Sequence, residues 1–412
     1  MTATTKTSLT KHVYKIDFEN LMDKSNNLIC DHNSLTLCKA FAKTGNFTAD
    51  FADMVMNVYK VEGRTFFYMS SNSVCEFKNK QTYNISKAAF NPAPELIGVP
   101  YKGERQVLAV SNKTVEILGI EKKTLTESYG KYLTICNNVL FCAKDNCLYF
   151  TAPMKDDGGI ENVELKNFIT LPPQSGNIKG LYTFGKKLYV VCQRHIYHLT
   201  VTGKPLEYEL KQESLLELNV LENTVLGNGD TFYFVSDKNL CEFNGKTLKK
   251  YDFLEEEINS FEFCGIADGC YLIQYYNQEQ YLLRGFDFSK SLPFYTYTMH
   301  CFSKYGGLGI DDTYSLALFQ KQINAGHFVN YYSKKFNMES GKRKRIIEIE
   351  GFSAGSIKLY IKGDFGLESV FIEGATTQKL NVISKDFLVY FSCVTGMLPL
   401  TDLKVKYQVL GE

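Results

Sequence analysis

The sequence predicts an all-β fold, a six- or seven-bladed β-propeller followed by a small C-terminal β-sandwich. Two observations predict the propeller. A strand–turn–strand unit at Thr65–Tyr83 (TFFYMSSNSVCEFKNKQTY) returns at Thr231–Tyr251 (TFYFVSDKNLCEFNGKTLKKY), and weaker copies recur between and beyond these two. A third observation predicts the sandwich, because after Phe336 this unit gives way to short strands separated by glycines.

The repeated unit has the composition of two β-strands. Its first half is an aromatic run, and its second half alternates around a glutamate, Glu76 in one copy and Glu242 in the other. Aromatic and β-branched residues suit a pleated, buried surface. A turn at Asn79-Lys80 ends the unit, and residues of this kind favour the backbone conformations of a tight reversal.

The copies begin 39 to 45 residues apart, counted between the leading apolar residues of successive runs. A period of about 40 residues with several short strands is typical of a four-stranded propeller blade. One blade cannot bury both of its faces, so neighbouring blades must stack and the ring must close. The alternative is a chance succession of hairpins in a β-sandwich. The starting residues are Phe67, Leu108, Leu148, Leu188, Phe232, Tyr271 and Leu316.

The composition excludes the better-known kinds of propeller. The chain of 412 residues has 30 Phe and 27 Tyr but no Trp, whereas WD repeats depend on a Trp-Asp pair. Neither the Asp-box of sialidase-type propellers nor the paired glycines of kelch repeats occur. The net charge of +1 gives no general electrostatic argument for binding nucleic acid or an acidic membrane.

The sequence predicts no metal or other cofactor. Its 12 cysteines form no Cys-x-x-Cys pair, and most lie in apolar strands, as buried free thiols of a protein made in a reducing compartment do. His195 and His198 would face opposite sides of a strand. Glu255–Glu257 is interpreted as a solvated turn. Neither a secretory signal nor a membrane-spanning stretch is found, which predicts a soluble protein made in a cytoplasm.

The early strands are expected to close the ring by pairing with the last blade. They are the alternating stretch Val13–Phe18 and the stretch Leu28–Ala42. Phe51–Tyr59 fits either a strand or a short helix, and Asp156–Phe168 is interpreted as an insertion that is either a binding loop or a passive surface loop. The predicted parts are an N-terminal segment with closing strands (1–54), the propeller (55–336) and the β-sandwich (337–412).

The C-terminal part opens on an alternating strand, Ile346–Phe352, in which Ile347 and Ile349 are expected to share one face and Ile346 to take the other. Several further short strands follow, ending with Leu403–Leu410. Each large apolar side chain that such strands bury contributes about 1.5–3 kcal/mol, which is enough for an independent core.

A basic run precedes this strand and is the only dense charge cluster. It can contact phosphates of a passing nucleic acid, form ion pairs with Glu348 and Glu350, or remain in water. We treat it as a candidate contact to DNA or to a partner protein. Its members are Lys342, Arg343, Lys344 and Arg345.

This layout resembles a family of tailed-phage proteins. A propeller of Trp-free units followed by a β-sandwich, opening on the basic strand Lys342–Ile349 and ending in a strand such as Leu403–Val409, is similar to the tail nozzle proteins of short-tailed phages. These are also called tail tubular protein B, and neck and tail-ring proteins are related. The resemblance extends from about Val55 to the end of the chain. The chain is short for the group, whose members often carry extra platform domains.

The resemblance implies a structural virion protein of a tailed bacteriophage. Copies would form a homo-oligomeric ring in the tail or neck, next to the portal, the adaptor and other tail proteins. Genomic DNA would pass through the ring without sequence-specific contacts during ejection. The resemblance implies no catalytic residue, no cofactor and no small-molecule substrate, and it implies assembly in the host cytoplasm.

Two other classes of protein are compatible with the residues. A propeller-type receptor- or glycan-binding protein, such as a fibre or adhesin component, could stack sugars on Tyr275–Tyr281 and on Tyr295 and Tyr297, although these rings can equally pack between blades. A glycoside hydrolase needs two carboxylates that converge on one bond. No motif fixes such a pair, so the sequence predicts that the protein is not an enzyme.

Overall fold

The fold is described from a computed structural model of the whole chain. It describes residues 10–410 except 27, 32, 38, 44–53, 126–129, 203, 205–207, 214–217, 238, 253–262, 268–269, 275–279, 285–290, 293–298, 312–315, 323–327 and 339–340. Among these residues, helix is confined to the four-residue α1 (Phe18–Leu21) and to three 3-10 turns, η1 (Ile160–Val163), η2 (Pro173–Ser175) and η4 (Thr395–Met397). The prediction of an all-β fold is confirmed.

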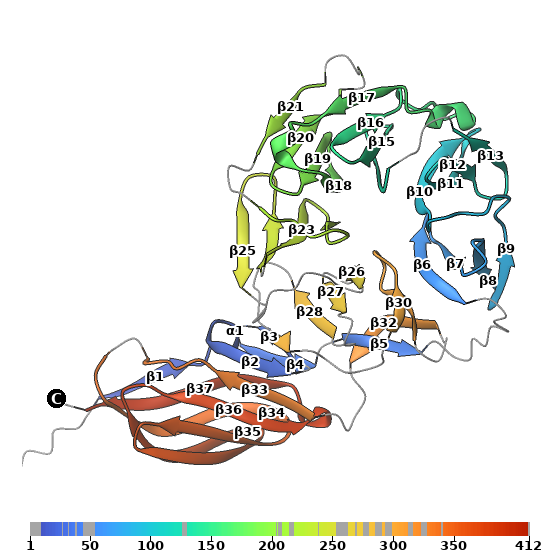
Figure 1. Cartoon of the computed structure of the whole chain (residues 1–412). Coiled ribbons are helices and arrows are strands. Elements are labelled where there is room, and N and C mark those ends of the chain that lie inside the picture. The colour runs from blue at the N-terminus through green and yellow to red at the C-terminus, as the bar shows by residue number, and fades with distance from the viewer. Residues whose placement is uncertain are drawn as a thin grey trace, which may run out of the picture. The chain divides into compact units, whose positions relative to one another are not determined.

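The predicted β-propeller is confirmed as well. Small antiparallel sheets follow one another around a common centre (Figure 1), and we number them as blades 1 to 7 in the order of their first strands. Six have four strands, and blade 6 has three described strands.

Blade 1 has β6 (Val55–Val61), β7 (Arg64–Met69), β8 (Val74–Lys78) and β9 (Gln81–Asn84), and blade 2 has β10 (Glu95–Tyr101), β11 (Glu104–Ser111), β12 (Thr114–Ile117) and β13 (Glu121–Thr124). Blade 3 has β14 (Tyr132–Cys136), β15 (Val139–Lys144), β16 (Cys147–Phe150) and β17 (Asn167–Thr170), and blade 4 has β18 (Ile178–Phe184), β19 (Lys187–Cys192), β20 (Ile196–Thr200) and β21 (Leu210–Gln212). Blade 5 has β22 (Leu226–Asn228), β23 (Thr231–Ser236), β24 (Asn239–Phe243) and β25 (Leu248–Asp252), and blade 6 has β26 (Phe263–Ala267), β27 (Cys270–Gln274) and β28 (Gln280–Arg284). Blade 7 has β30 (Met299–Phe302), β31 (Leu308–Asp311), β32 (Leu316–Gln322) and β5 (Lys39–Lys43).

The ring closes through its first strands. Each of β6, β10, β14, β18, β22, β26 and β30 contacts the first strand on either side, and β30 returns to β6. Apolar side chains fill the spaces between blades. One cluster joins Val55 and Phe67 of blade 1 to Cys301 and Ile310 of blade 7, all buried. The closure that the repeat pattern required is therefore made by a continuous core.

Tight turns within the blades follow the turn chemistry of the sequence. Asn79-Lys80 joins β8 to β9 with φ of 54° and 62°. Glu62-Gly63 and Lys102-Gly103 make the first hairpins of blades 1 and 2, also with positive φ at both positions. Two positive φ values match the right-handed twist of the flanking strands, so each turn sets the register of its hairpin.

Two of the predicted repeat starts are wrong by one strand. Leu148 lies on β16 and Leu316 on β32, which are third strands, whereas Phe67, Leu108 and the other starting residues lie on second strands. The second strands of blades 3 and 7 are β15 and β31. Third strands also carry apolar residues, for instance Leu148 on β16 and Leu316 on β32, and an apolar run alone does not show which strand of the blade it forms.

The C-terminal part is one ten-stranded sheet that curls around a core. The order is β29-β2-β33-β36-β34-β37-β4-β3, with β1 on β37 and β35 on β34, and the described strands pair antiparallel except β2 with β29. Its strands are β1 (Lys11–Lys15), β2 (Met22–Asn26), β3 (Leu28–Asp31), β4 (Ser34–Leu37), β29 (Ser291–Leu292), β33 (Phe328–Ser333), β34 (Lys344–Gly363), β35 (Gly366–Ser384), β36 (Leu388–Val394) and β37 (Leu400–Val409).

The N-terminal strands correct the expectation that they pair with the last blade. Only β5 takes a place in blade 7, whereas β1 to β4 belong to the ten-stranded sheet. Within the stretch Leu28–Ala42, β3 and β4 pair as antiparallel strands. Phe51–Tyr59, whose sequence fits either a strand or a short helix, contributes to strand β6. The chain divides into two compact units, one formed by residues 1–42, 279–296 and 319–412 and the other by residues 43–278 and 297–318.

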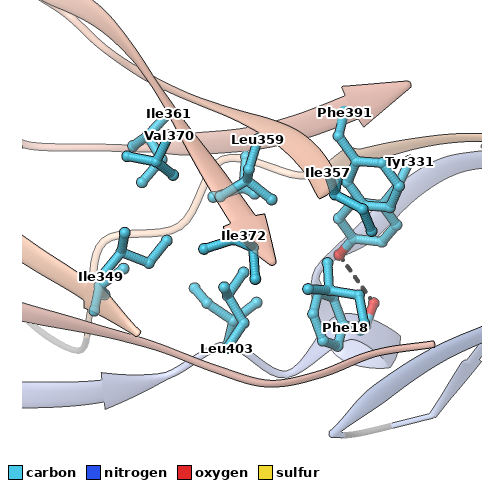
Figure 2. Close-up of a cluster of buried hydrophobic side chains, with 14 of the residues drawn as sticks. Phe18, Tyr331, Ile349, Ile357, Leu359, Ile361, Val370, Ile372, Phe391 and Leu403 are labelled. Carbon is cyan, nitrogen blue, oxygen red and sulfur yellow. Dashed lines mark hydrogen bonds between the residues drawn. The ribbon is translucent and has the colours of Figure 1, made fainter. Parts of the chain in front are cut away.

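The two longest strands make both layers of the C-terminal part. β34 pairs with β37 along its first half and with β36 along its second half, with a register shift between Ser353 and Ile357. The halves enclose one core (Figure 2), in which Ile349 and Leu403 face Leu359, Ile361 and other fully buried residues. The two layers expected of a sandwich therefore come from a single sheet that curls.

A bulge corrects the predicted facing of the first isoleucines. Ile346 and Ile349 are both fully buried in this core, and Ile347 is only partly buried. The register of β34 against β35 and β37 shifts between Ile346 and Glu348. The extra residue reverses the alternation from that point on, which a two-residue pattern in the sequence does not reveal.

The repeated glutamate of the blade unit has a structural role in blade 2. Glu116 on β12 is fully buried, and its carboxylate accepts hydrogen bonds from the backbone N–H groups of Lys87, Ala88 and Gly119 at 2.8, 2.8 and 3.1 Å. Lys87 and Ala88 lie in the connection from blade 1 to blade 2. The side chain therefore fixes the path of the chain from one blade to the next.

We expect Glu116→Gln to lower the free energy of unfolding by about 1–3 kcal/mol, because the amide replaces a charged acceptor and turns N–H donors toward backbone N–H groups. Denaturant unfolding followed by circular dichroism measures the change. Glu104→Gln on the exposed start of β11 is the matched control and should have no measurable effect. Equal stability of both variants would contradict this role.

Candidate functional site

The structure separates the members of the predicted basic run. Lys342, Arg343 and Arg345 are exposed, whereas Lys344 is fully buried and its Nζ donates to the carbonyl oxygen of Lys342 at 3.0 Å. Burial lowers the pKa of Lys344. The Arg343 guanidinium lies 5.1 Å from the ring centre of Phe365. Three of the four side chains can therefore meet a partner.

Glu348 and Glu350 pair with lysines of β37. Lys406 contacts both carboxylates, and Lys404 lies 3.4 Å from Glu350. The hydrogen bond from Lys406 is the main cause that lowers the pKa of Glu350. Arg345 instead donates to Asn381 at 2.7 Å. The sequence allows ion pairs between the basic run and these glutamates. In the structure, both glutamates instead pair across the strands with lysines of β37.

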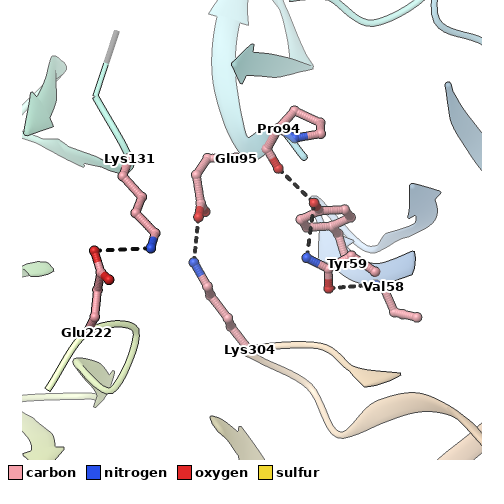
Figure 3. A network of polar contacts seen from close by, with 8 residues as sticks. Val58, Tyr59, Pro94, Glu95, Lys131, Glu222 and Lys304 are labelled. Atoms are coloured by element: carbon pink, nitrogen blue, oxygen red, sulfur yellow. Dashed lines mark hydrogen bonds and ion pairs between the residues drawn. The ribbon is translucent and has the colours of Figure 1, made fainter. Parts of the chain in front are cut away.

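The interior of the propeller contains a polar group that the sequence did not indicate. Lys304, which follows β30, lies 2.6 Å from Glu95 at the start of β10. Lys131, just before β14, lies 3.2 Å from Glu222, just before β22. Figure 3 shows both pairs facing each other. We call these four side chains the axial ion pairs.

Each axial ion pair joins blades that are not neighbours. Lys304 belongs to blade 7 and Glu95 to blade 2, with blade 1 between them, and Lys131 and Glu222 belong to blades 3 and 5, with blade 4 between them. Blades that are not adjacent approach each other only inside the ring. The pairs therefore cross the interior around which the first strands lie.

The surroundings of the axial ion pairs are partly desolvated. The pKa of Tyr132 is raised, chiefly by burial and further by the carboxylate of Glu222. On the other side, Tyr59 donates to the carbonyl oxygen of Pro94 at 2.7 Å, next to Glu95 (Figure 3). Burial is also the largest cause that raises the pKa of Tyr59. Two bases and two acids neutralise each other here, so the arrangement has no excess charge for an anionic ligand.

The insertion of blade 3 is held against blade 2. The backbone N–H groups of Lys102 and Gly103 donate to Gly158 and Asp156 at 2.8 Å each. Glu164 pairs with Lys123 and Lys166, and hydrogen bonds from these lysines lower its pKa to about 2. These contacts fix the path of the insertion on blade 2. Both interpretations, a binding loop and a passive surface loop, stay predictions.

Histidines and cysteines occupy ordinary structural positions. His198 lies on β20 beside Glu213, and nine described cysteines are free thiols, eight of them buried. Burial raises the pKa of the Cys142 thiol to about 12. In the described ranges, no group of three or more His, Cys, Asp or Glu side chains has the arrangement of a metal site. No helix within those ranges has the length and apolarity that crossing a membrane requires.

Three sequence predictions lie on residues outside the described ones. They concern the first five residues of the proposed sugar-stacking segment Tyr275–Tyr281, the pair Tyr295 and Tyr297, and the acidic run Glu255–Glu257. They stay predictions. Among described residues, sequence reasoning missed the axial ion pairs, since Glu95 and Lys304 are 209 positions apart and no local pattern links them.

No protein-family model and no curated protein matches the chain. Solved propellers are similar in structure at low identity. BamB from Moraxella catarrhalis is 8% identical, with 77% of this chain and 99% of that chain covered at a TM-score of 0.44. The Pan2 WD40 domain from Neurospora crassa is also 8% identical, with 69% and 95% covered at 0.43.

The class that the geometry defines is a β-propeller with a C-terminal curled antiparallel sheet. This assignment rests on the closed ring of first strands and on the sheet order. The similarity to BamB and to the Pan2 domain concerns the fold and adds no function.

We expect the Lys304–Glu95 pair to couple weakly. Both side chains are partly exposed, at 38% and 28%, so a double-mutant cycle with Lys304→Met and Glu95→Gln should give a coupling energy of about 0.2–1 kcal/mol. In about 1 M NaCl the coupling should fall, because the Debye length is then about 3 Å. A matched cycle on Lys131 and Glu222, which are 48% and 54% exposed, should give less. Coupling that is zero at low salt would contradict the cross-ring contact.

Proposed function

We propose that this chain is a structural subunit of a tailed-bacteriophage particle, which assembles with copies of itself into a ring in the tail or neck around the path of the genome. The observation that carries the proposal is the pair of cores: a closed propeller and a β-sheet core whose strands β1 to β4 precede the propeller and whose long strand β34 begins within the basic run. The sequence resemblance rested on a propeller followed by a β-sandwich. The structure keeps both cores but departs from that order, because β1 to β4 and β29 join the same sheet.

The way in which the C-terminal sheet is built suits a subunit that must withstand mechanical force. β1, near the N-terminus, pairs with β37, near the C-terminus, over five residues from Lys11 to Lys15. The first and last described strands are thus hydrogen-bonded in one sheet, beside a core of fully buried residues such as Ile349 and Leu359. To pull β1 or β37 out of this sheet, a force must break the backbone hydrogen bonds between them.

The axial ion pairs indicate where the genome would not pass. They cross the interior of the propeller, and their opposite charges cancel. We therefore propose that the DNA path lies between copies in the ring and not along the axis of one propeller. A surface without large net charge can border this path without holding the DNA.

The ring is tested with the full chain. Negative-stain microscopy and mass photometry of the purified protein should show closed rings with one copy number, and purified particles should contain the chain in that same copy number. A protein that stays monomeric at every concentration and is absent from particles would overturn the proposal. Soluble monomers that bind host surface sugars would favour the receptor-binding alternative.

The exposed members of the basic run have their own test. Changing Lys342, Arg343 and Arg345 together to Ser should leave ring assembly intact and lower the fraction of particles that deliver DNA, because these exposed side chains can contact phosphates or a neighbouring tail protein. Lys344 is kept, since its buried stem supports the fold. Unchanged infectivity of the triple variant would rule out this role.

A further inference from the structure

Part of the outward face of the C-terminal sheet carries aromatic and basic side chains over four strands, and the exposed acid Glu373 follows it on β35, two residues beyond Phe371. Alternate positions of 330–332, 388–392, 358–362 and 367–371 face away from the core on β33, β36, β34 and β35. Asn, Tyr, Leu, Ser, Lys and Phe occupy them, and none is Asp or Glu. An exposed face of this composition marks a contact surface.

Three tyrosines form a stacked ladder across this face. Tyr332 on β33 lies opposite Tyr390 on β36, with ring centres 5.6 Å apart and planes at 8°. Tyr390 lies opposite Tyr360 on β34, at 5.0 Å and 7°. Because the rings stack in the direction across the strands, they stand on edge above the sheet. Only the two ends of the ladder can offer a ring face.

The ladder is interrupted at one end. The position opposite Tyr360 on β35 is Ser369, and β35 pairs with β34 as its sole partner among the described strands. Because Ser369 is small, no ring of β35 stacks on the second face of Tyr360, and the Lys358 ammonium lies over that ring at 5.2 Å from its centre. Phe371, which is 51% exposed, and Leu367, which is 53% exposed, flank Ser369 on β35. We call the position beside Tyr360, over Ser369, the ladder notch.

Lysines flank the ladder notch on both sides. Lys358 lies opposite Phe371, with its Nζ 5.2 Å from the ring centre of Tyr360 and 5.7 Å from that of Phe371. Lys362, also exposed, lies opposite Leu367. Along β35, Glu368 accepts a hydrogen bond from the backbone N–H of Asn381 at 3.1 Å, and the exposed Glu373 lies two residues beyond Phe371. A flat ring that stacks on Tyr360 in the notch takes the place of the Lys358 ammonium, which then pairs with an adjoining anion.

We propose that this face binds single-stranded nucleic acid without sequence preference, with one base stacked on Tyr360 in the ladder notch and the adjoining phosphates on Lys358 and Lys362. Sheet faces with exposed aromatic rings and flanking cations bind single strands in this way, because every base has a flat face that can stack on such a ring. A duplex keeps its bases stacked internally and cannot fill the notch. The inference uses the C-terminal sheet alone and stands whether or not the chain forms a ring.

The geometry favours this ligand over two others. A sugar could also stack on Tyr360, but a neutral sugar gives Lys358 and Lys362 no anionic partner. A second copy of the chain is the other possible occupant, but two faces that each carry Lys358 and Lys362 would repel each other if these lysines met. Charge complementarity therefore selects a polyanion with flat groups.

The experiment measures fluorescence anisotropy of a labelled oligothymidylate of about 20 nucleotides with the full chain at low salt. Tyr360→Ala should raise Kd at least about fivefold through lost stacking. Lys358→Gln with Lys362→Gln should lower the slope of log Kd against log salt by about 1.4, since a single strand loses about 0.7 per phosphate contact. Ser369→Trp fills the notch from within and should also weaken binding, without removing any existing contact.

Matched controls lie on the propeller. Phe168→Ala removes a ring that is 64% exposed, and Lys113→Gln removes an exposed charge, and neither should change Kd. The proposal is overturned if the oligonucleotide does not bind, if Tyr360→Ala and Ser369→Trp both bind like the unchanged chain, or if a duplex of equal length competes as well as the single strand. Self-association that depends on Tyr360, measured by sedimentation without nucleic acid, would assign the face to a second copy instead.

Discussion

Contact between successive first strands is the interaction on which the propeller depends. A single blade has two apolar faces and buries neither of them alone. Each first strand meets the next, and β30 of blade 7 returns to β6 of blade 1. Buried residues from two blades at a time fill the spaces, for instance Phe141 and Val190 between blades 3 and 4. Removing one blade would leave two faces in water, so the ring is stable only as a whole.

The C-terminal part meets the same requirement by another route. It has one sheet, and the sheet must curl to cover its own apolar face. The register shift between Ser353 and Ile357 bends β34, so that Ile349 in the first half and Leu359 in the second point into one core. A bulge near Ile347 keeps both Ile346 and Ile349 inside. Local irregularities thus decide which side chains are buried and which remain on the outward face.

The positions of the polar side chains described above follow from the way these two cores are built. The axial ion pairs exist because the ring brings strands from distant parts of the chain to one interior, and they bind those parts without excess charge. The tyrosine ladder exists because three strands from separate segments become neighbours in the curled sheet. The basic run, by contrast, is contiguous in sequence but divided in space, since Lys344 turns inward.

The sequence by itself determined the kind of structure that recurs locally. The propeller was predicted from the period of the repeat and from the turn at Asn79-Lys80, and a second β core from the change of sequence pattern after Phe336. These features could be predicted because strand composition and turn chemistry act within a few residues. Only the tertiary structure decided that β1 to β4 join the ten-stranded sheet, that Ile346 shares a face with Ile349, and that Glu95 meets Lys304. Pairing partners and bulges depend on contacts between distant segments, and no local pattern of residues contains that information.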